Sequence, residues 1–160
     1  VYNSDKTAFT LINNILGGPA MNSRFNVAVR ERYGFCYNIE SQYIPFSDTG
    51  LFYVYAGVDH GAADRTLDIV RNELHRMAAN ALTPYALRQA QRQFIGQMAI
   101  NAAAGSNEMQ SIGKAFLAFD KVDSLEEMSA DIMSLTTADL QRVAEHYFAA
   151  ESCSTLIYGN

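Results

Sequence analysis

Arg30 and Tyr37, which are separated by six residues, are the two side chains whose types and spacing suggest chemistry. We expect Arg30 in the last turn of a helix that ends before Gly34, and Tyr37 at the start of the following strand. A guanidinium and a phenol held on rigid elements could donate hydrogen bonds to a peptide carbonyl that becomes an oxyanion. The spacing alone fits a structural role equally, because Arg suits a helix C-terminus and Tyr suits a strand.

The histidines and cysteines do not suggest a second reactive centre. His60, His75 and His146 each lack another His three or four residues away, so the sequence predicts no metal site. Cys36 and Cys153 are too few for a disulfide framework, and Cys36 has no nearby His to activate it as a nucleophile. The "LGGPA" glycines lack the Lys-Ser/Thr of a phosphate-binding loop and do not follow a strand.

The composition excludes several classes of protein. With 160 residues, of which 49% are hydrophobic and 18% charged, the chain fits a single domain over 1–160. Its net charge of -5 and scattered arginines argue against nucleic-acid binding. No apolar run approaches the roughly 20 residues of a membrane span, and the start resembles no signal peptide. Because it begins at Val1, we expect a domain excised from a longer chain. If the source is bacterial, we expect a soluble periplasmic or cytoplasmic protein.

The predicted elements begin with two helices and a hairpin. The first helix is expected from Ser4 or Asp5 to the Gly17-Gly18 pair, and the second begins near Asn22 or Ser23. Strands at 37–46 and 51–59 are joined by the turn residues "SDTG". Both faces of 51–59 are apolar, so we expect this strand to be central and buried.

Helices dominate the remainder of the chain. They are expected over 65–80, 83–105, 106–119, 124–133 and 136–149. Thr83, Ser124 with Glu127, and Thr136 or Thr137 have the types and spacing of helix caps, and Gly105 is expected to end a helix. The segment 152–159 is β-prone and is expected to return to the sheet as a strand. The predicted class is α+β, a two-layer sandwich of a mainly antiparallel sheet with helices packed on one face.

The run "LGGPAMNSRFNVAVRERYGFCYNIES", residues 16–41, resembles the C-terminal, non-zinc half of the insulinase/pitrilysin family of metallopeptidases, the inverzincins. That family shows Gly-Gly ahead of "MNSR", a helix ending in Arg-Glu, and then Gly and Tyr, with the same separation of Arg and Tyr. The segments "YAGVD", "LTPYALRQAQRQF" and "LTTADLQRVAEHYF" follow the order of the family.

The resemblance implies a function shared between two halves. The N-terminal half of such enzymes carries H-x-x-E-H and zinc, whereas the C-terminal half binds no metal and contributes an Arg and a Tyr. Arg30 and Tyr37 would then bind peptide substrate and stabilise the transition state, with zinc in a partner domain or subunit. Since H-x-x-E-H is absent here, this chain is not expected to hydrolyse peptides alone. The alternative is a non-enzymatic scaffold of the same fold, like the core proteins of a respiratory complex.

Overall fold

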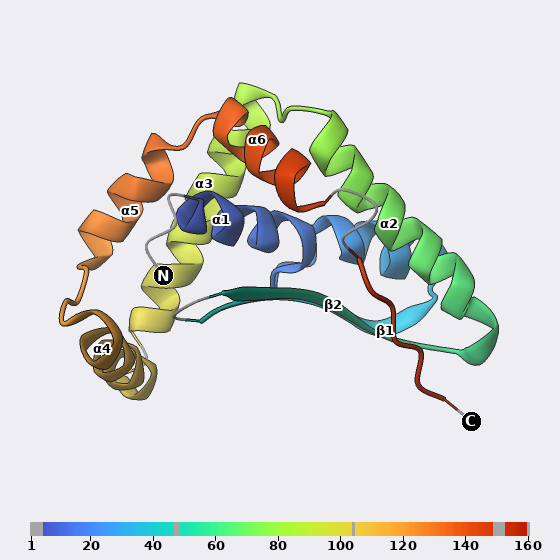
Figure 1. Cartoon of the computed structure of the whole chain (residues 1–160), viewed down its shortest axis with the longest axis horizontal. Helices are drawn as coiled ribbons and strands as arrows, with labels where there is room; N and C mark the ends of the chain where they lie inside the picture. Colours follow the sequence, from blue (N-terminus) through green and yellow to red (C-terminus); the bar gives the residue numbers. More distant parts are fainter. Residues whose placement is uncertain (1–4, 47–48, 104, 149–152, 160) are drawn as a thin grey trace.

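The structure is a computed structural model that describes residues 5–46, 49–103, 105–148 and 153–159. Figure 1 shows a long antiparallel hairpin with most of the helices above it. The elements, in chain order, are α1 (Lys6–Gly17), η1 (Asn26–Glu31), β1 (Cys36–Pro45), β2 (Gly50–Val58), η2 (His60–Ala62), α2 (Ala63–Ala79), α3 (Pro84–Ala102), α4 (Gly105–Phe119), α5 (Leu125–Ser134) and α6 (Thr137–Tyr147). This arrangement confirms the α+β class.

The hydrophobic core lies between the hairpin and the helices. Phe9 of α1 is its centre, with ring centroids 4.7 Å from Tyr43 of β1, 5.5 Å from Phe52 of β2 and 5.0 Å from Tyr147 of α6. Leu11, Ile12 and Leu16 of the same helix are fully buried, as their spacing predicts. Helix α1 therefore joins the sheet to the outer helices, and it holds the segment that follows it against β1.

The prediction of a central, buried second strand is wrong for the part of the chain that the structure describes. Strand β2 pairs with β1 alone, in the register Ile39↔Ala56 and Ser41↔Val54. The inward side chains of Phe52, Val54 and Ala56 pack against the core, whereas Leu51 and Tyr55 are exposed. The apolar residues on both faces suggested a strand covered on both sides, but only the inward face of β2 packs against the core.

The predicted closing strand is also wrong over its described residues. Residues 153–159 form no strand, and position 152 lies outside the described ranges. Thr155 Oγ1 accepts a hydrogen bond of 3.2 Å from Arg71 Nη2 of α2, and Leu156 and Tyr158 are almost fully exposed. High β propensity alone did not form a strand here, because a strand also needs a partner with which to exchange main-chain hydrogen bonds.

Three predicted helix caps are confirmed. Thr83 Oγ1 accepts a 3.2 Å hydrogen bond from the N–H of Ala86. Ser124 and Glu127 form the expected capping box, and Thr136 forms a second one with Asp139. These side chains satisfy main-chain groups that have no partner within their own helices, so short local patterns were enough to predict them.

Two predictions about helix ends need correction. The side chain of Asp5 does not cap α1; its Oδ1 instead accepts a 2.7 Å hydrogen bond from Arg142 Nη2 of α6. Ser4, the alternative cap, lies outside the described residues. Gly105 begins α4, and α3 ends earlier, at Ala102. In both cases the residue type suited the predicted role. Neighbouring residues, in the sequence or in space, determined the role that the residue has in the structure.

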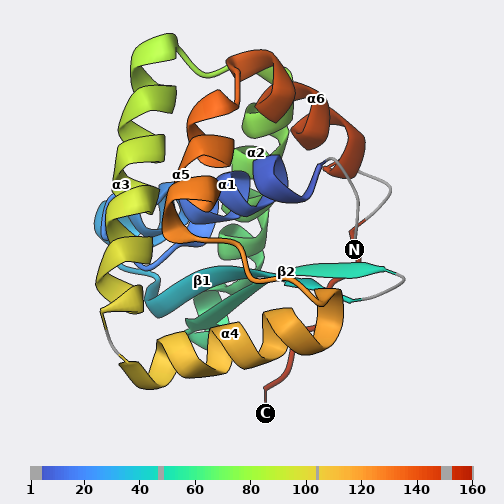
Figure 2. The same cartoon turned by 90° about the vertical axis from the view of Figure 1, so that its left-hand side faces the viewer.

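Helix α4 lies apart from the other helices. Figures 1 and 2 show it below the hairpin, on the side opposite α1, and of the described helices it mainly contacts α3. Met109, Ile112 and Phe116 share one exposed side of this helix. Despite that apolar surface, no helix in the described ranges has the length and apolarity needed to cross a membrane.

Candidate functional site

Arg30 lies in a π-helical turn, which the sequence did not predict. The helical segment that follows the Gly-Gly pair widens into a π-helix over Asn26–Glu31, with Arg30 in its last turn. Val29, its neighbour, is fully buried and anchors the turn in the core, while Arg30 itself is half-buried. A π-helical turn changes the direction of the side chains that follow it, and such turns occur frequently at functional sites.

Tyr37 lies at a β-bulge. Cys36 pairs with Val58 and Asn38 pairs with Gly57, so Tyr37 is the additional residue on β1. Its side chain is 97% exposed, whereas the thiol of Cys36 beside it is buried. A bulge breaks the strict alternation of a strand and can redirect a side chain. Both residues singled out by the sequence therefore lie at backbone irregularities.

A short aromatic turn connects these two irregular segments. Gly34 has a φ of 65°, a left-handed conformation that glycine adopts without steric cost. The rings of Tyr33 and Phe35 on either side of it stack at 5.1 Å, and Arg65 at the start of α2 lies over Phe35 with its Cζ 4.9 Å from the ring centroid. This packing restrains the path of the chain between the end of the helix and the start of β1.

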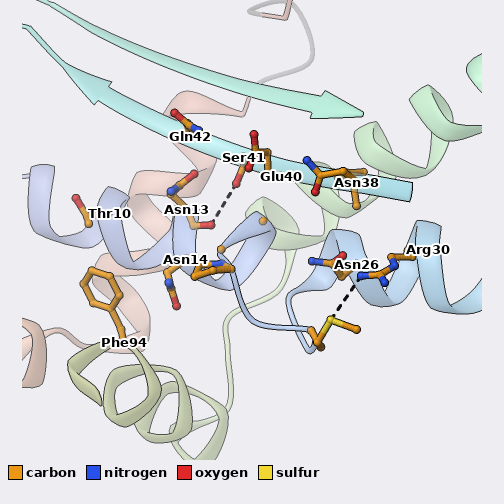
Figure 3. Close-up of a pocket in the computed structure, with 15 residues that line it drawn as sticks. Thr10, Asn13, Asn14, Asn26, Arg30, Asn38, Glu40, Ser41, Gln42 and Phe94 are labelled. Carbon is orange, nitrogen blue, oxygen red and sulfur yellow. Dashed lines mark hydrogen bonds between the residues drawn. The ribbon is translucent and has the colours of Figure 1, made fainter. Parts of the chain in front are cut away.

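An open pocket of about 320 Å³ lies beside β1, as Figure 3 shows. Arg30 lines it, together with the end of α1, η1, α3 and a run of β1. The donors of Arg30 are little used within the described residues: its guanidinium makes a hydrogen bond there from Nη1 to the thioether of Met21, a weak acceptor, at 3.5 Å. Tyr37 does not line this pocket, so the structure associates only one of the two predicted residues with it.

Five of the fifteen residues that line the pocket have side-chain amides, which the sequence analysis did not single out. The residues with amide side chains are Asn13, Asn14, Asn26, Asn38 and Gln42. Asn14 Nδ2 donates to Gln97 Oε1 at 2.7 Å, and Asn26 Nδ2 donates to Ser23 Oγ at 2.8 Å. The available signal was the pair Asn13-Asn14, two polar residues inside the otherwise apolar run "LINNIL" of α1.

Gly17 and Gly18 shape the same wall. A Cβ atom at Gly17 would lie 2.4 Å from the main-chain nitrogen of Ser41, and one at Gly18 would lie 2.6 Å from the carbonyl oxygen of Asn14. Ser41 Oγ also donates a 3.2 Å hydrogen bond to the carbonyl oxygen of Asn13. The Gly-Gly pair was predicted only to end a helix, but Gly17 also allows α1 to approach β1 closely, and Gly18 lies close to Asn14 within α1.

The electrostatics of the pocket leave Cys36 unreactive. Burial raises the pKa of its thiol, and the positive charge of Arg30 opposes part of that rise. The thiol therefore remains protonated at neutral pH, and a protonated thiol is a poor nucleophile. No three His, Cys, Asp or Glu side chains come together as a metal site within the described residues. The chemistry available in the pocket is hydrogen bonding by a guanidinium, by amides and hydroxyls, and by the carboxylate of Glu40.

Comparison with known proteins identifies the family of this chain. Residues 2–94 match the family model of the peptidase M16 inactive domain. An uncharacterized zinc protease of Streptomyces coelicolor is 35% identical over 137 residues, which are 86% of this chain and 30% of that protein. This chain spans 30 to 38% of the length of the curated relatives that it matches.

Two solved structures share the fold. A peptidase M16 inactive domain from Pseudomonas fluorescens has a TM-score of 0.77 at 23% identity, over 90% of this chain and 34% of that one. A chain of Complex III2 from Candida albicans has a TM-score of 0.77 at 19% identity, over 91% of this chain and 37% of that one. The family model matches more than half of the sequence and confirms the resemblance, so this chain belongs to the family of peptidase M16 inactive domains.

Proposed function

We propose that this chain is the half of a zinc metalloendopeptidase that holds the substrate. In this proposal a separate domain or subunit carries H-x-x-E-H and zinc, and Arg30 and Tyr37 extend from this chain toward the peptide bond that is cleaved. The observation that carries the proposal is that both residues lie at backbone irregularities, a π-helical turn and a β-bulge. Such irregularities have a cost in regular hydrogen bonding and are common beside active sites.

The two side chains would have complementary tasks. The zinc of the partner would supply activation of the attacking water. Among the described residues the guanidinium of Arg30 donates to the weak acceptor Met21, so its other donors can bind the carbonyl of the peptide before and during the reaction. The exposed phenol of Tyr37 can donate to the same oxygen as it gains negative charge. A donor positioned for the negatively charged oxygen of the transition state lowers the activation barrier, rather than only tightening the binding of substrate.

Steady-state kinetics of the assembly with the zinc-bearing half test this proposal. Tyr37→Phe should lower kcat by roughly 100- to 1000-fold, the loss that follows removal of one oxyanion donor. Arg30→Ala should also raise KM, because a guanidinium can hold the ground-state peptide. Tyr85→Phe and Arg88→Ala, at exposed positions of α3, are the matched controls and should leave both parameters unchanged.

The stability of the domain provides the counter-test. Substitution of surface groups that make few internal contacts changes stability by about 0.5 kcal/mol or less, so both variants should melt like the parent chain. If Tyr37→Phe and Arg30→Ala instead lowered the melting temperature by several degrees while the folded fraction cleaved peptide normally, both residues would be structural. This chain without its partner should cleave no peptide.

A scaffold without catalytic activity is the second candidate, because a chain of Complex III2 has the same fold. The gene context separates the two candidates. An H-x-x-E-H motif in the same reading frame or in a neighbouring gene would support the peptidase, and its absence would support the scaffold. The presence of both Arg30 and Tyr37 favours the peptidase, since a scaffold has no need of an oxyanion donor.

A further inference from the structure

A second pocket lies between the turn that leads into η1 and the C-terminal end of α2. Its volume is about 350 Å³, and the described residues that line it are Arg24, Glu73, Arg76 and Asn80. Arg24 belongs to the helical turn that precedes η1, whereas the other three lie in the last two turns of α2 and at its C-cap. All four lining side chains are polar, and three of them are charged. This pocket shares no lining residue with the pocket beside Arg30.

The charged side chains of this second pocket are unequally paired. Arg76 Nη1 donates to Glu73 Oε1 at 3.0 Å, and only 13% of the Glu73 side chain is exposed. The guanidinium of Arg24 makes no hydrogen bond or ion pair with another described residue. The pocket holds two guanidinium groups and one carboxylate, and that carboxylate is already paired with Arg76. One positive charge, on Arg24, is therefore left without a counterion of its own among the described residues.

Burial makes the uncompensated charge of Arg24 costly. The side chain is half-buried, and the loss of water around its guanidinium lowers its pKa. The carboxylate of Glu73 raises this pKa, whereas the like charge of Arg76 lowers it further. The net effect is a decrease, so the attraction by Glu73 does not offset the lost hydration. A buried charge is stabilised by a partner of opposite sign that also accepts its hydrogen bonds.

The donors around the pocket are suited to an oxyanion. Each guanidinium presents a planar fork of N–H groups that matches two oxygens of a carboxylate or a phosphate. Asn80 removes a local repulsion, because its main-chain N–H and its Nδ2 both donate to the carbonyl oxygen of Arg76 at 3.2 Å. That carbonyl lies at the end of α2, where an unpaired acceptor would repel an anion. The remaining group that opposes anion binding is Glu73.

We propose that Arg24 and Arg76 bind the oxygens of a phosphate or carboxylate group in this pocket. Glu73 holds Arg76 in place and, because it carries the same sign of charge as the ligand, limits the affinity. The bound anion would connect the turn that leads into η1 to α2, two parts of the chain that already lie in contact where η1 meets α2. This inference goes beyond the proposed function and does not depend on it.

The test is a titration of this chain followed by nuclear magnetic resonance. Inorganic phosphate replaces sodium chloride stepwise at neutral pH and constant ionic strength, so that general screening does not change. The side-chain Nε–H signals of Arg24 and Arg76 should shift together along one saturable curve. Sodium acetate forms the second arm of the experiment. The arm with the lower dissociation constant identifies the ligand group as a phosphate or a carboxylate.

Protein variants give the inference opposite signs to satisfy. Arg24→Ala and Arg76→Ala should each weaken binding about tenfold or more, the loss expected for a charge-assisted hydrogen bond, whereas Arg88→Ala, at an exposed position of α3, should not. Glu73→Gln keeps the shape of the side chain and removes the competing negative charge, so binding should tighten about fivefold. Glu126→Gln, at an exposed position of α5, makes the same change in net charge and is the control.

Three results would each overturn the inference. They are the lack of a saturable shift at Arg24 and Arg76 in both arms, equal effects of Arg76→Ala and Arg88→Ala, and a Glu73→Gln variant that binds no tighter than the parent chain. Arg76 is exposed, so Arg76→Ala keeps the inference testable even if Arg24→Ala misfolds. The titration involves no turnover and no zinc-bearing half, so its failure would leave the kinetic test of the proposed function unaffected.

Discussion

The guanidinium carbon of Arg65 lies 4.9 Å from the centre of the Phe35 ring, and this contact joins the start of α2 to the turn between Arg30 and Tyr37. The same carbon lies 5.9 Å from the ring of Tyr33, which stacks on Phe35. A cation over two stacked rings restrains a glycine-containing turn that would otherwise be free to move. The relative placement of the π-helical turn and the β-bulge depends on this restraint.

Removal of that cation should loosen the turn. Arg65→Ala should lower the free energy of unfolding by about 0.5–1 kcal/mol, the contribution of a cation–π contact at an exposed site. Deuterium exchange should rise over 33–37 in particular. Arg88→Ala, which removes an exposed arginine from α3, is the control. Equal exchange over 33–37 in the two variants would mean that Arg65 does not restrain the turn.

The close approach of α1 to β1 should make Gly17 intolerant of any side chain. In Gly17→Ala the new methyl group would meet the main chain of Ser41, which cannot move aside without shifting the strand. We expect destabilisation of about 1–3 kcal/mol, as for other overpacked sites. Gly96→Ala, in an α3 position with open space around it, is the matched control and should be neutral or stabilising by up to about 1 kcal/mol. Chemical denaturation of both variants measures the difference, and similar midpoints would contradict the packing argument.

Gln91 should stabilise the end of α5. This side chain is 2% exposed, and its Nε2 donates to the carbonyl oxygens of Ile132 at 2.9 Å and Leu135 at 3.1 Å. Gln91→Leu removes the side-chain donor to both carbonyls and leaves the carbonyl of Ile132 with only the longer 3.4 Å hydrogen bond from the N–H of Leu135, so we expect a loss of about 1–3 kcal/mol. Gln89→Leu, at an exposed position of the same helix, should cost far less. A thermal melt of each variant tests this, and equal melting temperatures would show that water replaces Gln91.

The capping box of α6 should make stability depend on pH in the acid range. Hydrogen bonds from the side chain and main chain of Thr136 hold the pKa of Asp139 below its usual value of 3.8. A carboxyl whose pKa is lower in the folded state contributes its full stabilisation above the unfolded value and loses it as the pH falls through the folded value. The parent chain should therefore lose stability below about pH 4.

Thr136→Val should isolate this contribution. It removes the hydroxyl that donates to Asp139 at 2.6 Å while keeping the shape of the side chain. We expect a loss of about 0.5–2 kcal/mol at neutral pH, typical of a lost cap, and a weaker dependence on pH between about 4 and 2. Denaturation curves across that range would show it, and a pH dependence equal to that of the parent would assign the acid sensitivity to other carboxyls.

The sequence by itself was sufficient to predict the features that depend on interactions between residues close together in the chain. The caps at Thr83, Ser124 and Thr136 depend on hydrogen bonds over three residues, and the hairpin depends on a turn between two β-prone runs. The family resemblance, confirmed by the match over 2–94, rests on a continuous run of residues and so needed no tertiary information. It also selected Arg30 and Tyr37 as candidates.

Tertiary structure decided the features that depend on contacts between distant segments. The buried Val29 and the register Cys36↔Val58 accompany the π-helical turn at Arg30 and the bulge at Tyr37, and neither irregularity changes the hydrophobic pattern from which elements are predicted. The role of Gly17 appears only when α1 lies against Ser41, and Asn13 becomes part of a pocket only beside β1. The predictions of a central, buried placement for the strand at 51–59 and of a closing strand over the described residues 153–159 were wrong for the same reason: propensity describes a segment, whereas a strand's neighbours and burial are properties of the assembled chain.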